Sequence, residues 1–170
     1  MLSKLNPRSF IVAHFETFKD YSTGKISRSE VLLFLLLPLV LAVIHVVYFT
    51  ISEAVISIVV SAASIVAGLM LNLMVLLYTL VVSNKANAKV YSNFDKFKLI
   101  CRETLATVAF SVLLCVLLVV GALMCLTDSK IFYYFGWLVM VYSGVAVLFC
   151  LLIILKRSYL LIDFDFVEVP

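Results

Sequence analysis

The hydrophobic positions of this 170-residue chain form long uninterrupted runs, the longest of which extends from about Ala54 to Val82. As a helix rising 1.5 Å per residue, a run of this length would be about 44 Å long, which exceeds the thickness of the bilayer core. The pattern therefore predicts an all-α integral membrane protein. We expect a four-transmembrane-helix bundle with spans at about 31–49, 54–82, 104–126 and 131–155.

Small and polar residues recur within the second span at steps of three or four. They are Ser57, Ser61, Ser64, Gly68 and Asn72. This spacing puts them on one helical face, where small side chains let two backbones approach and an amide in hydrocarbon needs a partner. We expect the face to contact protein rather than lipid and to assemble a homo-oligomer, with the lining of a shared pore as the alternative.

Positive charge is concentrated between and outside the spans in a way that predicts the orientation. Five Lys or Arg residues precede the first span, five lie in the loop 83–103 and two follow the last span, whereas Lys130 alone lies on the other side. The positive-inside rule then places both termini in the cytoplasm. The chain divides into a cytoplasmic N-terminal segment 1–30, a bundle 31–155 and a cytoplasmic tail 156–170, and we expect the bacterial inner (plasma) membrane.

The N-terminal segment contains a short amphipathic pattern. Asn6 and Pro7 are typical of a helix start, and the apolar side that follows comprises Phe10, Ile11, His14, Phe15 and Phe18. A helix with this face would lie on the membrane surface or dock onto a partner protein.

The third and fourth spans carry packing signals. A small-residue side of the third span is formed by Thr107, Ser111, Cys115, Ala122 and Cys125. Gly136 and Gly144 share a face of the fourth span, whose start at 132–135 and Trp137 resembles an aromatic belt at the outer headgroups. His45, near the outer end of the first span, is expected to be neutral and hydrogen-bonded, with proton sensing as the alternative.

The residues that catalysis requires are scarce. The chain is 65% hydrophobic and only 14% charged, its four cysteines form no C-x-x-C pair, and it has two histidines and no phosphate-binding or nucleophile motif. No Asp, Glu, Lys or Arg lies inside a predicted span, so intramembrane proteolysis and ion-coupled transport lack their usual groups. We therefore expect no enzyme, no catalytic or metal-binding residue and no cofactor.

The charged cytoplasmic residues are candidates for contact with lipid or with a cytoplasmic protein partner. They are Lys85, Lys89, Lys96, Lys98, Arg102, Asp163 and Asp165. Basic loops bind anionic lipid first, and we expect no direct binding of nucleic acid. In the tail, polar and apolar residues alternate over 163–170, so it either stays solvated or adds as a strand to the partner.

Three non-catalytic functions fit these features: an oligomeric pore, a membrane anchor or sensor with a soluble partner, and a packing subunit of a larger complex. The layout of a short first span, the second-span run 64–77, a basic loop and a fourth span closing at 155–159 resembles small four-span membrane proteins of bacterial anti-phage systems. The Kiwa membrane subunit and the Rex membrane protein of phage lambda are examples. The resemblance implies a membrane component that senses infection or changes membrane permeability and works with a cytoplasmic partner.

Overall fold

The computed structural model describes residues 8–18, 28–85 and 94–167, and within these segments the chain is helical, with no strand. The helices are α1 (Arg8–Glu16), α2 (Arg28–Tyr48), α3 (Glu53–Lys85), α4 (Phe94–Cys125) and α5 (Lys130–Val167). Each of the last four contains a stretch that is long and apolar enough to cross a membrane: Ser29–Tyr48, Glu53–Ser83, Phe97–Cys125 and Lys130–Tyr159. The prediction of an all-helical, multi-pass membrane protein is confirmed at this level.

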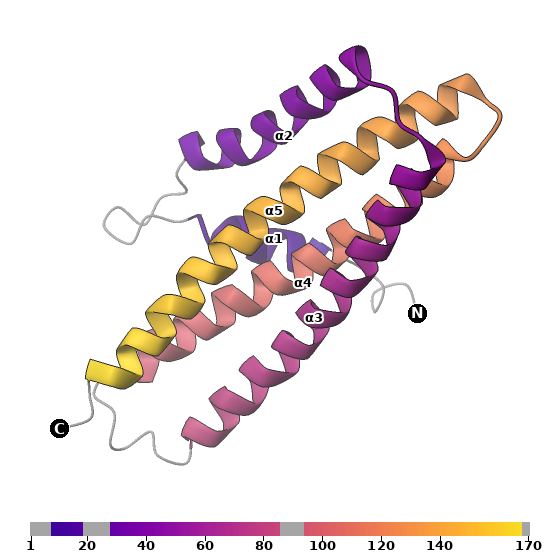
Figure 1. The fold of residues 1–170 in the computed structure, drawn as a ribbon. Helices are drawn as coiled ribbons and strands as arrows, with labels where there is room; N and C mark the ends of the chain where they lie inside the picture. Colours follow the sequence, from indigo (N-terminus) through magenta and orange to yellow (C-terminus); the bar gives the residue numbers. More distant parts are fainter. Residues whose placement is uncertain (1–7, 19–27, 86–93, 168–170) are drawn as a thin grey trace.

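A hairpin of α4 and α5 forms the centre of the bundle (Figure 1). All five residues of the predicted small-residue side of α4 are buried, as are Ala146 and Cys150 on α5. Small side chains on the facing sides let the two backbones approach closely, which supplies van der Waals contact where lipid gives no hydrophobic drive for helix association. The predicted packing role of this side is consistent with its burial.

The other two long helices flank the hairpin on different sides. α2 packs against α5, and α3 packs against α4 (Figure 1). Their buried side chains recur at helical spacing: Phe34, Pro38 and Ala42 on α2, and Ile56, Ala63, Met70 and Leu77 on α3. Each flanking helix therefore buries one stripe fully, and many of its other apolar side chains are exposed on the outside of the bundle.

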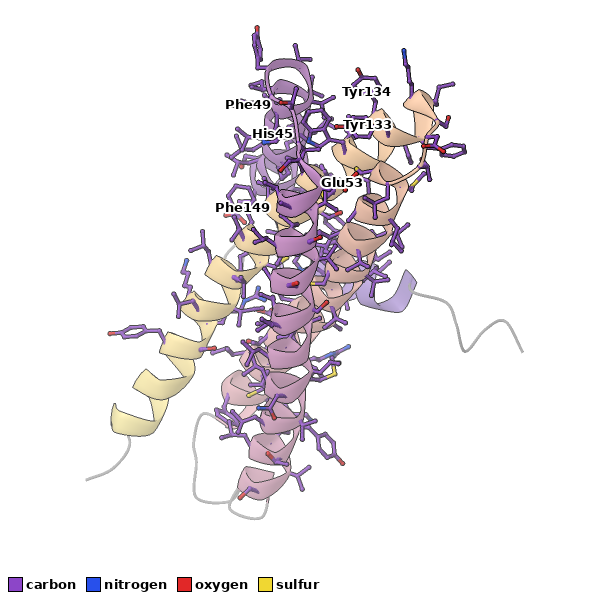
Figure 2. All side chains as sticks on the ribbon, turned by 45° about the vertical axis from the view of Figure 1, so that its right-hand side comes forward. His45, Phe49, Glu53, Tyr133, Tyr134 and Phe149 are labelled. Carbon is purple, nitrogen blue, oxygen red and sulfur yellow. The ribbon has the colours of Figure 1, made fainter. Side chains whose placement is uncertain are left out.

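The two ends of the bundle differ in character. The connections at 49–52 and 126–129 meet at one end, here called the turn end, where His45, Phe49, Glu53, Tyr133 and Tyr134 gather (Figure 2). Trp137 does not belong to the predicted outer aromatic belt, because its side chain is only 2% exposed and packs in the core with Met140 and Ala122. Phe132, Tyr134 and Phe135 do remain exposed there.

At the opposite end, here called the Arg157 end, the helices run further than the predicted spans. α4 already begins at Phe94, ten residues before the predicted start at Thr104, and α5 continues to Val167. Charged residues end an apolar run without ending a helix, since Lys, Arg and Glu are good helix formers. The alternating pattern of the tail thus lies in a helix as far as Val167, and strand addition to a partner stays a prediction.

Candidate functional site at the Arg157 end of the bundle

The short helix α1 does not lie apart from the bundle but packs against α4. Its His14 is fully buried and stacks on Phe110 of α4, with ring centroids 4.3 Å apart and an angle of 10° between the planes. Phe34 of α2 covers the imidazole at 5.2 Å, and Phe18 meets it edge-on at 5.3 Å. An aromatic cluster therefore fixes α1 to two of the spanning helices, and this contact involves the apolar side that the sequence predicted.

The imidazole of His14 is held in its neutral form. Neither ring nitrogen has a hydrogen-bond partner within the described part of the chain. Burial first, and the nearby positive charge of Arg157 second, lower the pKa of His14 from 6.5 to about 4. Burying a ring without hydrogen bonds costs free energy, and burying it in the protonated form would cost more. Docking of α1 therefore depends on the protonation state of the His14 imidazole.

Arg157 of α5 joins three helices through its guanidinium group. Nη1 donates to the Oγ1 of Thr107 at 2.9 Å and to the backbone carbonyl oxygen of Glu103 at 3.1 Å, both on α4. Nη2 donates to the carbonyl oxygen of Thr17, just after α1, at 3.4 Å and pairs with the Glu103 carboxylate at 3.5 Å. The side chains of Arg157 and Glu103 are 14% and 18% exposed, so the ion pair is largely shielded from water.

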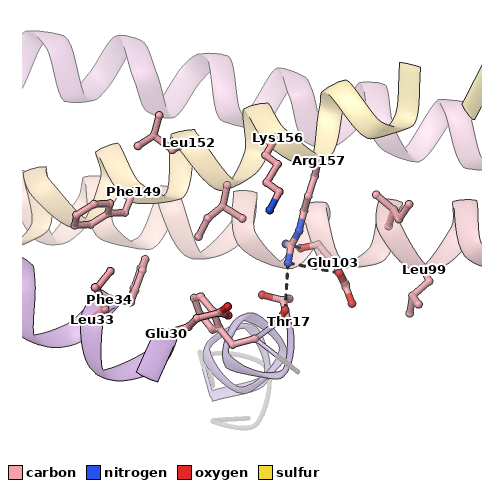
Figure 3. A pocket seen from close by; sticks show the side chains of 13 residues that line it. Thr17, Glu30, Leu33, Phe34, Leu99, Glu103, Phe149, Leu152, Lys156 and Arg157 are labelled. Carbon is pink, nitrogen blue, oxygen red and sulfur yellow. Dashed lines mark hydrogen bonds and ion pairs between the residues drawn. The ribbon is translucent and has the colours of Figure 1, made fainter. Parts of the chain in front are cut away.

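A cavity of about 710 Å³ lies beside this ion pair, between α1, α2, α4 and α5 (Figure 3). Glu30, Glu103, Lys156 and Arg157 contribute charge to its wall, and Thr17 contributes a hydroxyl group. The remaining lining is apolar: Phe18, Leu33, Phe34, Leu99, Ile100, Phe149, Leu152 and Ile153. A mostly apolar cavity with a few convergent polar groups is the usual form of a small-molecule site.

The small-residue face of α3 lies on the outside of a single copy, and its predicted role in a homo-oligomer stays a prediction. Ser57, Ser61, Ser64, Gly68 and Asn72 are all exposed, and a methyl group built on Gly68 would meet nothing within 4 Å. Ser61 donates to the carbonyl oxygen of Ser57, and Ser64 donates to that of Val60, so both hydroxyls are satisfied inside the helix. The face is exposed in a single copy and is open to a second molecule or to lipid.

The charged residues proposed for cytoplasmic contacts are only partly described. Lys98 and Arg102 lie exposed on α4, near the Arg157 end. The side chains of Lys85, Lys89, Lys96, Asp163 and Asp165 lie outside the described side chains. The structure thus brings Lys98 and Arg102 to the same end as the cavity, although neither lines it.

His45 is hydrogen-bonded, as the sequence suggested. The indole Nε1 of Trp137 donates to Nδ1 of His45 at 3.1 Å, and Phe49 stacks on the imidazole at 5.0 Å. Because tryptophan can only donate, this bond requires an unprotonated Nδ1. This bond is the one expected of a neutral His45, and proton sensing stays an untested alternative.

Within the described segments, no group of three His, Cys, Asp or Glu side chains is placed to hold a metal ion. Cys101, Cys115, Cys125 and Cys150 are free and buried. Cysteines in such surroundings act as small apolar packing residues.

Sequence reasoning missed the residues that form the site. Arg157 was read only as a charge that fixes the orientation, and Glu103, Thr17 and Thr107 were not connected with it. One signal was available, because Glu103 lies 23 residues before the turn at 126–129 and Arg157 lies 28 residues after it. In a hairpin of two helices such residues both lie far from the turn on neighbouring helices, where opposite charges can pair.

Comparison with known proteins gives no relative from which a role could be transferred. No protein-family model, curated protein or solved structure matches this chain. The functional argument therefore depends on the residues themselves.

Proposed function

We propose that the chain is the membrane component of a bacterial anti-phage defence system, which senses or perturbs the inner membrane and couples to a cytoplasmic protein partner. It would act without catalysis, cofactor or direct contact with nucleic acid. The setting of phage defence comes from the resemblance in layout described above. The coupling of membrane to cytoplasm is argued from the contacts of α1.

The observation that carries the proposal is the way α1 is attached. His14 lies between Phe34 of α2 and Phe110 of α4, and Arg157 of α5 reaches the carbonyl oxygen after α1. A shift of α2 against the central hairpin, caused by a change in bilayer thickness or tension, alters the aromatic cluster directly. Movement of the spans would then reposition or release a segment that the partner can read.

The proposal requires the Arg157 end to face the cytoplasm with both termini. A reporter active on only one side of the membrane, fused in turn to each terminus and to the 126–129 turn, tests this orientation. We expect cytoplasmic signals from both termini and an external signal from the turn. An external C-terminus would contradict the orientation and with it the coupling.

The function itself is tested by isolating the tagged protein in mild detergent and, in parallel, following membrane potential with a dye in cells that express it. A stoichiometric soluble partner with an unchanged potential supports the anchor or sensor. Absence of any partner together with an unchanged potential would contradict it and favour a packing subunit of a larger membrane complex.

The second candidate is an oligomeric pore, and the exposed face of α3 favours it. Asn72 presents an amide to the outside of the bundle, near the middle of a span, with open space beside Gly68. A polar group at this depth is stabilised by another copy or by water in a shared channel. Depolarisation without a partner, lost on Asn72→Leu or Ser61→Leu, is the result this candidate predicts.

A further inference from the structure

The cavity at the Arg157 end is polar at one end and apolar at the other. Glu30, Lys156 and Arg157 lie within three residues of the ends of their spans, whereas Phe34 and Phe149 lie further inside theirs (Figure 3). A lipid in the adjoining bilayer leaflet has the same order, with its headgroup at the surface and its acyl chains inward. The cavity therefore matches an amphiphile better than a wholly polar or wholly apolar molecule.

An opening towards lipid is provided by two leucines. Leu33 of α2 and Leu152 of α5 line the cavity, and both are 61% exposed on the outside of the bundle. Apolar, exposed side chains of spanning helices border the hydrocarbon of the bilayer. The occupant can thus enter sideways from the membrane, and part of its chain can remain in the bilayer.

The wall of the cavity carries two negative and two positive side chains, and one of each sign forms an ion pair. Glu103 and Arg157 pair with each other at 3.5 Å. Within the described segments, Lys156 on α5 and Glu30 on α2 form no ion pair, although both border the cavity. One cation and one anion on different walls suit a headgroup that carries one charge of each sign, whereas a purely anionic headgroup meets Glu30 as a like charge.

We propose that this cavity binds one phospholipid with a phosphoethanolamine headgroup. The Lys156 ammonium contacts the phosphate oxygens, and the Glu30 carboxylate accepts hydrogen bonds from the lipid ammonium group. The upper part of one acyl chain lies against Phe34 and Phe149. The site rests on the cavity and its charges alone, and it holds whether or not the chain functions in phage defence.

The size of the cavity suits this occupant. About 710 Å³ falls within the roughly 300–1,000 Å³ of typical ligand sites, so a headgroup and the start of an acyl chain are enclosed while the rest extends outward. Because Thr17 and Phe18 also line the cavity, the bound lipid contacts the chain directly after α1. Occupancy and docking of α1 are therefore coupled.

Native mass spectrometry of the full chain tests the site. The protein is purified in mild detergent, delipidated and mixed with phosphatidylethanolamine, phosphatidylcholine or phosphatidylglycerol bearing identical acyl chains. We expect one phosphatidylethanolamine per protomer, held at least tenfold more tightly than the other two. Phosphatidylcholine lacks the ammonium hydrogens that Glu30 accepts, and phosphatidylglycerol lacks the cation altogether.

Four charge variants and one blocking variant test whether the lipid binds in this cavity. Glu30→Gln should abolish the preference for phosphatidylethanolamine over phosphatidylcholine, and Lys156→Gln should weaken retention of all three lipids. Glu53→Gln and Lys130→Gln remove the same charges at the turn end and serve as controls without effect. Leu152→Trp adds bulk at an exposed wall of the cavity and should prevent retention while the protein stays folded.

Lipid retention by the unmodified protein tests the proposal even if a variant fails to fold. Equal retention of the three lipids, or a preference for phosphatidylglycerol, would overturn it. Retention of no phospholipid would also overturn it and would assign the cavity to another occupant, such as a second copy. An unchanged lipid preference in Glu30→Gln would remove the assigned role of that carboxylate and overturn the proposed mode of binding.

Discussion

Gly121 and Gly136 bring the backbones of α4 and α5 into direct contact near the turn end. A methyl group built on Gly121 would lie 2.8 Å from the carbonyl oxygen of Gly136, and one built on Gly136 would lie 2.6 Å from that of Gly121. Neither position tolerates a side chain without a shift of a backbone, because the nearest atoms belong to the opposite helix. The central hairpin therefore depends on these two residues.

Alanine at either position should loosen the hairpin. We expect Gly121→Ala or Gly136→Ala to destabilise the protein by roughly 1–3 kcal/mol, the usual cost of overpacking, less the gain of up to about 1 kcal/mol in helix propensity. Thermal unfolding in detergent, followed by circular dichroism, measures the change. Gly68→Ala and Gly144→Ala are the controls, because their methyl groups meet nothing within 4 Å and an ordinary 3.6 Å contact, respectively. If all four variants unfold alike, the close approach is not what holds the hairpin.

Removal of the Arg157 guanidinium should release α1. In Arg157→Gln the carboxylate of Glu103 stays in a shielded site without its ion pair, at a cost near the lower end of roughly 3–5 kcal/mol. Hydrogen–deuterium exchange of the α1 amides should rise sharply. The double variant Glu103→Gln/Arg157→Gln should recover part of the stability, since no charge is then left uncompensated. Unchanged protection of α1 in the single variant would show that this network does not hold the helix.

Acid should release α1 through His14. Since burial first, and the charge of Arg157 second, lower its pKa from 6.5 to about 4, the undocked helix binds more protons between these values. Docking is therefore complete above pH 6.5 and is lost progressively as the pH falls towards 4. Exchange of the α1 amides, corrected for intrinsic rates, follows this window. His14→Phe fills the aromatic cluster without a titrating group, while Arg157 and Glu103 remain in both proteins. A pH dependence that persists in His14→Phe would contradict the role of the imidazole.

A bulky residue on the exposed face of α3 tests whether copies assemble there. Gly68→Leu should weaken a homo-oligomer, because the larger side chain holds two backbones apart. It should leave the protomer folded, since the space beside Gly68 is open inside a single copy. Light scattering in detergent gives the mass. An oligomer of undiminished size in Gly68→Leu would mean that the face borders lipid.

The sequence predicted the spanning helices well because a bilayer demands long apolar segments, and such segments can be read locally. It identified the small side chains of α4, from Thr107 to Cys125, and these are buried. The sequence predicted the ends of the helices less well, since α4 starts ten residues before the start of the predicted span. Lys98 and Arg102 precede the apolar run of the third span, yet both lie in α4. Hydropathy detects the apolar run and not the full length of the helix.

The candidate site was not predictable from local patterns. His14, Glu103 and Arg157 are far apart in the sequence; the α4–α5 hairpin brings Glu103 to Arg157, and the docking of α1 adds His14. The same limitation affects Trp137, which was expected at the headgroups because of its aromatic neighbours. Its indole instead turns inward to His45, a contact that depends on how α2 lies against α5.

The most direct test of the account asks whether α1 responds to the bilayer. The protein is reconstituted in vesicles of short-chain and of long-chain phospholipids with the same headgroup, and hydrogen–deuterium exchange is compared across the described helices. We predict that protection of α1 changes with bilayer thickness while α4 and α5 around Gly121 and Gly136 stay protected. Equal protection of α1 in both bilayers would contradict the proposal that movements of the spans reach the cytoplasmic face through this helix.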